Sequence, residues 1–366
     1  MLGVVSSPAL IIDAVAARLQ LFVERMEAES EEYGPDAETL AAAAAATLAG
    51  GKRLRARFCH AGWLAVARHD ARDAREDDRL WDVCAALEIF QSAALVHDDL
   101  IDNSDTRRGR PAAHRALESA HRSAHWTGDA DAFGRAAAVL LGDLLVAWSD
   151  DLLESAIDGH RHARDVRREY ARMRRDVTVG QFLDIAEESA WRVNDDATHA
   201  ARALRVASLK SARYSIEQPL VLGAALAGAT AEQQAALRAF GHPVGMAFQL
   251  RDDVLGVFGD EQVTGKPAGD DLREGKRTVL VALTREALDR PARTLVDELL
   301  GDPDLTASQV GFLQATIADS GALDRVEEMI ADYALSADRA LSGARLDNAA
   351  VSGLRDLARA ATIRSA

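Results

Sequence analysis

Residues 87–110 read LEIFQSAALVHDDLIDNSDTRRGR, an apolar helical run that ends in a cluster of acids and is followed by bases. Asp98 and Asp102 are four positions apart, so their carboxylates lie on one helix face, and Asp99 lies about 100° round. Like charges at this spacing cost a plain helix roughly 0.2–0.5 kcal/mol per pair. A bound divalent cation would offset that cost, and Mg²⁺ prefers a few carboxylates together with waters and phosphate oxygens. The alternative is a solvated helix end with incidental acids.

A second acidic pair closes a similar apolar run. Residues 246–260 read MAFQLRDDVLGVFGD, with Asp252 and Asp253 at the end of the apolar part. Two such pairs suggest carboxylate faces opposed across a cavity, between which metal ions could hold a diphosphate. The alternative is coincidence in a chain rich in aspartate.

Only four of the 43 basic residues are lysines, and two of them lie in residues 264–278, TGKPAGDDLREGKRT. Lys266 and Lys276 follow glycines there, close in sequence to the second acidic pair. Each is a compact charge on a flexible stem, suited to phosphate oxygens. We expect both lysines to contact phosphate.

Two further basic segments point to anion binding. Residues 50–55 read GGKRLR, in which the glycines allow the backbone to approach an anion and the bases neutralise it. The segment lacks the GxxxxGK[ST] spacing of a nucleotide-binding loop. Arg107 and Arg108, just beyond the first acidic cluster, form another clamp. The sequence therefore supplies acids for cations and separate bases for more than one phosphate group.

Composition excludes several other classes of protein. The 366 residues carry 43 basic and 58 acidic side chains, a net charge of −15, and 48% are hydrophobic. This fraction suits a globular protein with a large core, and the negative charge argues against a nucleic-acid binder. The apolar stretch at 219–231 is too short to span a bilayer, so we expect a soluble, cytoplasmic protein without stable membrane insertion.

The hydrophobic pattern predicts a nearly all-helical fold. Ala, Leu, Arg and Glu recur at spacings of three and four, and strand-like alternation is scarce. No linker rich in Pro, Gly or Ser divides the chain, so we expect one domain over residues 1–366. Cys59 and Cys84 are too few for a disulfide framework and are expected to be buried.

Together, the GGKRLR, DDLID with TRRGRPA, and FQLRDDVLGVFGD with TGKPAGDDLREGKRT segments resemble a bacterial all-trans polyprenyl diphosphate synthase, similar to geranylgeranyl diphosphate synthases. The resemblance runs in order over residues 50–277. It implies an all-α fold, an orthogonal bundle of antiparallel helices around a deep central cavity, in a chain that usually forms a homodimer. It also implies two substrates, isopentenyl diphosphate and an allylic diphosphate.

The resemblance assigns the acidic motifs to Mg²⁺, with three ions in each active site. Asp98 and Asp102 would bind Mg²⁺ from one wall and Asp252 from the other. Asp99 and Asp253 would support them.

The resemblance assigns the remaining motif residues to the substrates. The residues implied for isopentenyl diphosphate are Lys52, Arg55, Arg108 and Gln91. Those implied for the allylic diphosphate are Arg107, Lys210, Lys266 and, assisting, Lys276. Those implied near the developing carbocation are Lys210, Ser211 and Gln249.

Two positions depart from the family pattern. The second acidic motif reads DDVLG, so Gly256 stands where the usual DDxxD has its last acid, which predicts weaker metal binding rather than its loss. Ser211 stands where relatives usually have Thr, a change that keeps the hydroxyl.

The implied chemistry needs no nucleophilic side chain. The allylic C–O bond ionises in a water-poor pocket, and the double bond of isopentenyl diphosphate attacks the cation. The chain would grow along the helix away from Asp98, where Ala94 and Ala93 lie one turn back and Phe90 is the first large side chain on that face. If Phe90 is the floor, the product is geranylgeranyl diphosphate; if it turns aside, a longer polyprenyl chain follows.

Three rival interpretations remain open at this point. A terpene cyclase also uses DDxxD and Mg²⁺, but leaves Lys52 and Arg55 without a task. A metal phosphohydrolase is suggested by His97 beside Asp98, although His97 is better explained as a packing histidine. A non-catalytic subunit with the same fold is favoured only by Gly256.

Overall fold

The computed structural model describes residues 8–67, 74–259 and 268–362. The α-helices are α1 (Pro8–Ser30), α2 (Pro35–Leu48), α3 (Leu54–Val66), α4 (Ala74–Ile101), α5 (Ala113–Ser123), α6 (Ala130–Ile157), α7 (Ala163–Ala190), α8 (His199–Val206), α9 (Gln218–Leu226), α10 (Ala231–Phe258), α12 (Asp270–Glu274), α13 (Val279–Ala287), α14 (Arg290–Leu299), α15 (Ala307–Asp319), α16 (Ala322–Ala340) and α17 (Asn348–Thr362). The other elements are the 3-10 helices η1 (Glu31–Tyr33) and η2 (Asp196–Thr198), the π-helix η3 (Ala207–Glu217), and the strands β1 (Thr106–Arg107) and β2 (Arg110–Pro111).

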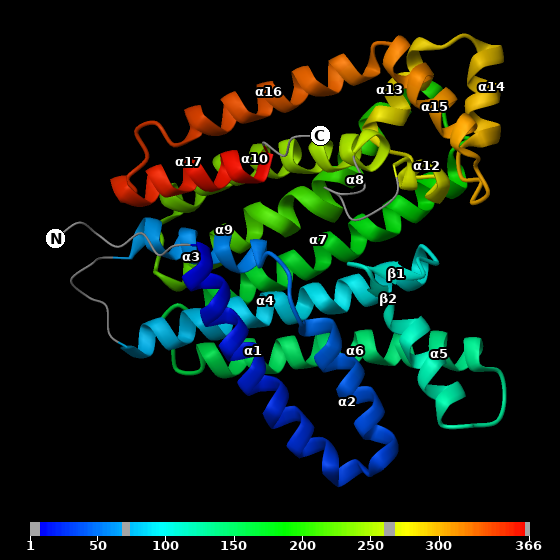
Figure 1. The fold of residues 1–366 in the computed structure, drawn as a ribbon. Helices are drawn as coiled ribbons and strands as arrows, with labels where there is room; N and C mark the ends of the chain where they lie inside the picture. Colours follow the sequence, from blue (N-terminus) through cyan, green and yellow to red (C-terminus); the bar gives the residue numbers. More distant parts are fainter. Residues whose placement is uncertain (1–7, 68–73, 260–267, 363–366) are drawn as a thin grey trace.

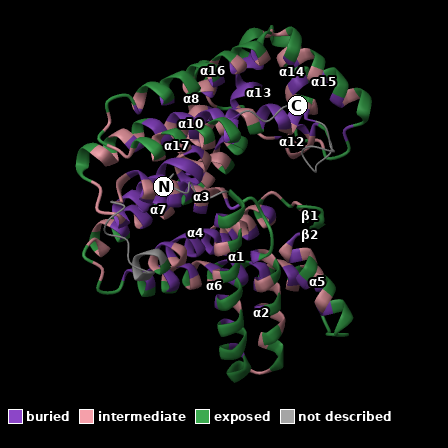
Figure 2. Ribbon diagram, turned by 60° about the vertical axis from the view of Figure 1, so that its left-hand side comes forward, coloured by how far each residue is buried: buried purple, intermediate pink, exposed green. Residues whose placement is uncertain are grey.

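Helix α4 is the central element of one half of the molecule (Figure 1). Its residues 83–90 are buried without interruption, as expected of a helix that other elements surround. It packs along α6 and also contacts α1 and α3. Buried residues therefore colour much of α4 in Figure 2, whereas the outer sides of α1 and α2 are exposed. The acidic residues at its C-terminal end therefore lie on a helix that packs against several others.

Helix α10 is the central element of the other half of the molecule. It packs against η3 on one side and α16 on another, and its buried Leu250 and Val254 belong to a core shared with α13 to α16. Its N-terminus carries a capping box, in which Thr230 and Gln233 bond to each other's backbone N–H groups. The second acidic motif thus also lies at the end of a long, well-anchored helix.

The π-helix η3 lies between α7 and α10. A Cβ on Gly180 of α7 would collide with the backbone of Lys210, and one on Gly245 of α10 would collide with the carbonyl of Ala212. Glycines at both positions therefore let the three elements approach closely. π-Helical turns are frequently found at functional sites, and this one carries Lys210, Ser211 and Tyr214.

The prediction of an all-α fold is confirmed. The exception is a short hairpin that the sequence pattern did not indicate, formed by pairing of β1 with β2. Its turn residues Arg108 and Gly109 both have positive φ, which fits a tight two-residue hairpin turn. Cys59 and Cys84 are buried, as expected. Among the described residues, no helix is both long and apolar enough to cross a membrane.

Candidate active site

The first acidic motif is surrounded by cations. Lys210 Nζ lies 3.2 Å from Asp98 Oδ1, and Arg107 Nη2 lies 3.5 Å from Asp98 Oδ2. Arg107 also donates from Nε to Asp99 Oδ1 at 2.7 Å. Asp99 is buried, so its main contact is this bond to the hairpin arginine. Its bond anchors Arg107 beside Asp98.

Lys210 joins the first motif to helix α7. Besides Asp98, its Nζ donates to Asp184 Oδ2 at 2.6 Å. Burial opposes ionisation of Asp98, but the charges of Lys210 and Arg107 outweigh burial and lower the pKa of that carboxyl. Burial likewise disfavours the charged form of Lys210, yet Asp98 and Asp184 raise its pKa above the usual range. Both groups are therefore held in their charged forms.

A basic cluster lies around the glycine turn of residues 50–55. Arg55 donates to Ser215 Oγ at 2.8 Å, and its guanidinium carbon lies 4.1 Å from the centroid of the Tyr214 ring. The Arg108 guanidinium lies against Gly51, with Nη1 2.9 Å from the position that a Cβ would take. Burial and the nearby charge of Arg53 lower the pKa of Arg108, as expected where cations outnumber carboxylates. Lys52 is exposed beside them.

Arg53 has a structural task, which corrects its interpretation as an anion-binding base. It is buried with φ of 48°, and its Nη2 donates to the Leu48 carbonyl at 2.6 Å. Its Nη1 lies 3.6 Å from Glu88 Oε2. Glu88 also accepts from the backbone N–H of Ala56 at 3.1 Å. Arg53 and Glu88 together fix the turn that presents Lys52 and Arg55.

The second acidic motif divides into an exposed and a buried aspartate. Asp252 is exposed, whereas Asp253 is buried and accepts a 2.6 Å hydrogen bond from Gln249 Nε2. Burial, followed by the charge of Asp271, raises the pKa of Asp253 well above its usual range. Asp252 is thus the member of the pair whose carboxylate is accessible and could hold a cation.

The space beside Gly256 is filled by another carboxylate. A Cβ at Gly256 would collide with Oδ2 of Asp271, which comes from the short helix α12. Position 256 itself carries no acid, but the carboxylate of Asp271 occupies the space beside it.

Lys276 lies close to both acidic motifs, because its charge acts on Asp102 of the first and on Asp253 of the second. Lys276 Nζ lies 3.3 Å from Asp271 Oδ1 and 2.5 Å from Glu274 Oε2. Ser104, just beyond the first motif, donates to Glu274 Oε1 at 3.4 Å. Burial and Asp98 raise the pKa of Asp102 to about 6, while Lys210 and Lys276 act to lower it. Lysines from both sides therefore act on the same carboxylate.

Small residues and then aromatic rings lie below Asp98 on α4. Ala93 is buried and Ala94 is half-buried. The Phe90 ring lies 6.2 Å from that of Tyr170 and 5.8 Å from that of Tyr214, both in edge-to-face geometry. Aromatic rings in this geometry attract each other beyond the effect of their burial. Phe90 is thus held in place by its neighbours.

The hydroxyl of Tyr214 donates to Gln91 Oε1 at 2.6 Å. Gln91 is thereby joined to the element that carries Lys210. His97 packs on α6, where a Cβ at Gly142 would collide with its ring, as expected of a packing histidine.

Of the residues implied by the sequence, direct contacts bring together Asp98, Asp99, Arg107 and Lys210, and Tyr214 connects Arg55 with Gln91. Lys266 lies outside the described residues. Ser211 is half-buried directly after Lys210 on η3. Reasoning from sequence did not assign Asp184, Glu88, Tyr214, Asp271 or Glu274, although the GQFLD segment at 180–184 and the acids between Lys266 and Lys276 were visible signals.

The donor set fits Mg²⁺. Among the residues that the structure describes, no three His, Cys, Asp or Glu side chains form a ready-made metal site. Mg²⁺ does not require one, because proteins commonly bind it through one or two carboxylates together with waters and substrate phosphates. Asp98 Oδ1 is buried and accepts no well-aligned hydrogen bond, and Asp102 lies one helical turn away. Hard oxygen donors are thus available on the first wall.

Comparison with known proteins adds independent findings. The family model of polyprenyl synthetase matches residues 37–315. A geranylgeranyl diphosphate synthase from Mycobacterium tuberculosis is 33% identical over 271 residues, which cover 74% of this chain and 69% of that protein. Component 2 of heptaprenyl diphosphate synthase from Geobacillus stearothermophilus is 32% identical over 337 residues, 92% of each chain.

A similar solved structure is that of geranylgeranyl pyrophosphate synthase from Corynebacterium glutamicum complexed with isoprenyl diphosphate and magnesium. It is 36% identical, with a TM-score of 0.90 over 97% of this chain and 99% of that one. Because the family model spans most of the chain and relatives above 30% identity cover more than two thirds of it, this chain belongs to the polyprenyl synthetase family and is a prenyltransferase.

Proposed function

We propose that the chain condenses isopentenyl diphosphate with an allylic diphosphate in a Mg²⁺-dependent reaction, and that its product is geranylgeranyl diphosphate. The observation that chiefly supports the proposal is the presence of two separate cationic groups: Lys210, which lies beside Asp98 of α4, and Arg55 with Arg108, which lie around the glycine turn. Two cationic groups suit two diphosphates, whereas a terpene cyclase or a phosphohydrolase would use one.

The allylic diphosphate would lie between the acidic walls. Bound Mg²⁺ would neutralise the charge that develops on the leaving group when the allylic C–O bond breaks. Three ions per site is part of the proposal. Lys210 would hold a phosphate oxygen of this substrate. The other cations proposed to hold it are Arg107, Lys266 and Lys276.

Isopentenyl diphosphate would be held by the cluster of Lys52, Arg55 and Arg108. Tyr214 joins this cluster to Gln91, because its ring contacts Arg55 and its hydroxyl bonds to Gln91. This arrangement would hold the double bond at close range to the allylic carbon. The proton lost in the last step would pass to the departing diphosphate.

The proposed product length depends on Phe90. With Ala93 and Ala94 above it, a prenyl chain would meet no large side chain on this face of α4 before Phe90. The contacts of Phe90 with Tyr170 and Tyr214 oppose its turning aside. A longer polyprenyl product is the alternative, and the similarity to a heptaprenyl diphosphate synthase component keeps it open.

We also propose a homodimer. Helix α7 exposes Val179, Phe182 and Ile185 at helical spacing, and neighbouring α6 exposes Val139 and Leu140. Such an apolar surface is typical of protein–protein contact. Light scattering of the purified chain should give twice its mass, and a Phe182→Glu variant that leaves the mass unchanged would remove this support. The cytoplasmic location and the single domain over residues 1–366 stay predictions.

The test of the reaction uses the purified chain alone. Labelled isopentenyl diphosphate is incubated with Mg²⁺ and with dimethylallyl, geranyl or farnesyl diphosphate. Incorporation that requires both substrates supports the proposal. Consumption of the allylic substrate alone would indicate a cyclase, phosphate release without extension would indicate a phosphohydrolase, and no turnover would indicate a non-catalytic subunit.

A further inference from the structure

Trp191 is among the largest fully buried side chains of the described residues, and it lies directly after helix α7. The same helix presents Asp184 to Lys210. The hydrogen-bond and ring partners of Trp191 are Asp297, His199, Arg277 and Arg285, to which no role in binding substrate or metal is assigned above. The role of this buried side chain must therefore be sought in its own contacts.

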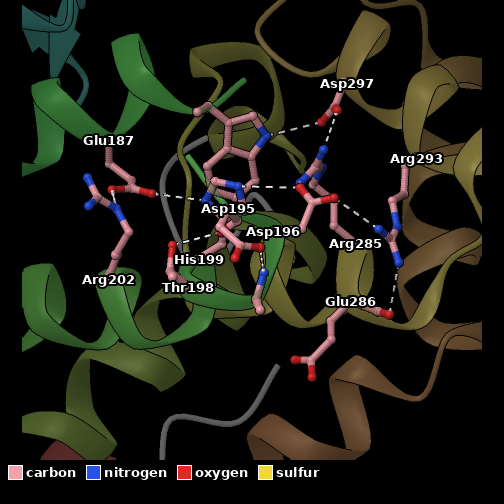
Figure 3. Close-up of polar contacts among 12 residues, drawn as sticks. Glu187, Asp195, Asp196, Thr198, His199, Arg202, Arg285, Glu286, Arg293 and Asp297 are labelled. Atoms are coloured by element: carbon pink, nitrogen blue, oxygen red, sulfur yellow. Dashed lines mark hydrogen bonds and ion pairs between the residues drawn. The ribbon is translucent and has the colours of Figure 1, made fainter. Parts of the chain in front are cut away.

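The indole of Trp191 is tied to the elements that follow the second acidic motif. Its Nε1 donates to Asp297 Oδ1 of α14 at 3.1 Å. Asp297 also accepts from Arg285 Nη2 of α13 at 2.8 Å, and Arg285 Nη1 donates to Asp196 Oδ1 at 2.7 Å. Figure 3 shows Arg285 between the two aspartates. The buried ring thus lies in a charged network that joins α7, η2, α13 and α14.

Helix α8 supplies a second set of contacts with the Trp191 ring. The His199 ring centroid lies 3.8 Å from that of Trp191, and His199 Nδ1 lies 3.1 Å from Glu187 Oε1. Arg202 donates to the same glutamate at 2.5 Å. Glu187 belongs to α7, the helix that Trp191 directly follows, so these contacts connect α8 to α7. The indole is thus held by Asp297 of α14 and by His199 of α8.

Arg277 depends on this ring. Its guanidinium carbon lies 5.0 Å from the Trp191 ring centroid, within the range of cation–π attraction. Its Nε and Nη1 are buried and have no hydrogen-bond partner among the described residues. The remaining attraction comes from the charges of Asp297 and Glu188. With few directional bonds of its own, the guanidinium is located chiefly by the indole.

Arg277 immediately follows Lys276, which pairs with Asp271 and Glu274 of α12. Asp271 in turn occupies the space beside Gly256 in the second acidic motif. A displacement of Arg277 would therefore shift Lys276 and the carboxylates that it holds.

We propose that Trp191 is a positioning residue for the second half of the active site: by holding Arg277, it fixes the turn that carries Lys276 and so favours binding of the allylic diphosphate. The ligand named here rests on the proposed function. The geometry of the turn rests on the contacts of Trp191 and Arg277 alone.

The test compares Trp191→Leu, Trp191→Phe and Arg277→Ala with a control, Trp148→Leu, whose ring packs on Phe22 of α1 at 5.7 Å between centroids. We expect Trp191→Leu to raise KM for the allylic diphosphate about tenfold and to leave KM for isopentenyl diphosphate nearly unchanged. Trp191→Phe keeps a ring and should give a smaller rise. The control should change neither KM. Equal changes in both KM values for Trp191→Leu would overturn the proposal.

The double variant Trp191→Phe/Arg277→Ala separates positioning from packing. If Trp191 acts through Arg277, the double variant should resemble Arg277→Ala alone. Multiplying effects would overturn the proposal. Arg277 is half-buried and lies outside the helices, so this arm remains informative if Trp191→Leu does not fold.

Calorimetric binding of inorganic diphosphate with Mg²⁺ gives a readout that does not need turnover. We expect Arg277→Ala and Trp191→Phe to weaken this binding, even if the wild-type chain were to fail in prenyl transfer. Unchanged diphosphate binding in both variants would overturn the positioning role, whereas wild-type binding without prenyl transfer would count against the proposed function only.

Discussion

Asp98 and Asp253 both stand near the end of a long apolar helix, yet their surroundings differ. Asp98 is partly exposed, and two cations, Lys210 and Arg107, lie within 3.5 Å of its oxygens. Asp253 is buried, and its hydrogen bond comes from the neutral amide of Gln249. Asp98 is thus held in its charged form, whereas in the second motif Asp253 is buried with a raised pKa and its partner Asp252 is exposed.

The comparison indicates how one site can be built from two unequal motifs. On the first wall, the neutralising charges come from the hairpin and from η3, which two glycines pack tightly between α7 and α10. On the second wall, acids and a lysine come from the short helix α12 and the turn after it. The residues around the first acidic motif are therefore held by contacts within the site. Those around the second motif depend on contacts outside the site, above all those of Trp191.

The largest effect should distinguish Asp98 from Asp253. Asp98→Asn removes a charged carboxylate that is proposed to bind Mg²⁺, and it should lower kcat roughly 10²–10³-fold. Asp253→Asn keeps the shape of a carboxyl whose pKa burial already raises well above its usual range, and should cost less than about tenfold. Steady-state kinetics at saturating Mg²⁺ measure both. Equal losses in the two variants would contradict the division between a charged and a supporting aspartate.

The next effect concerns the lysines of the two walls. Lys210→Arg keeps the charge but places a wider, planar group between Asp98 and Asp184, so kcat should fall about tenfold. Lys276→Arg keeps the charge beside Asp271 and Glu274, and should chiefly raise KM for the allylic diphosphate. Kinetics with both substrates varied will tell the two patterns apart. Full activity in Lys210→Arg would show that any cation suffices there.

Gly256→Ala tests whether Asp271 takes part in the second wall. The added methyl group would displace the Asp271 carboxylate, and we expect the Mg²⁺ concentration for half-maximal activity to rise about tenfold. Asp271→Asn should act in the same direction. Gly311→Ala is the matched control, because a Cβ there meets nothing within 4 Å. A Gly256→Ala variant with the Mg²⁺ dependence of the control would remove Asp271 from the account.

The smallest effect should be seen in the pH dependence of stability without metal. Burial and Asp98 raise the pKa of Asp102 from 3.8 to about 6, so between these values the folded chain binds more protons here than the unfolded chain. The resulting stabilisation is complete below pH 3.8 and is lost as the pH rises through about 6.

Asp102→Asn should abolish this contribution. Thermal unfolding in a chelator should show the wild type losing about 1–2 °C more than the variant between about pH 5 and pH 8. An identical pH dependence of Tm in both proteins would show that Asp102 has an ordinary pKa.

The parts of the site predicted from sequence are those fixed by local spacing. The separation of Asp98 and Asp102 by one helical turn, and the position of bases after glycines, follow from helix geometry and composition alone. The hairpin that presents Arg107 was not predicted, because its strands have two residues each.

Long-range arrangements could not be read from local patterns. The contact of Asp271 with Gly256 joins residues on different helices, and it places a carboxylate beside the position where the family motif usually has its last acid. Arg53 was grouped with its basic neighbours, but its backbone conformation and its bonds to Leu48 and Glu88 make it structural. Trp191 carries no sequence motif, and only packing brings Arg277 to it.

The most direct test of the central claim is the size of the product made by the purified chain from farnesyl diphosphate and labelled isopentenyl diphosphate with Mg²⁺. We predict a single product, geranylgeranyl diphosphate, for the wild type and longer products for Phe90→Ala. Failure of the wild type to extend the allylic substrate would contradict the proposed reaction. Extension with an unchanged product length in Phe90→Ala would contradict the proposed floor of the site.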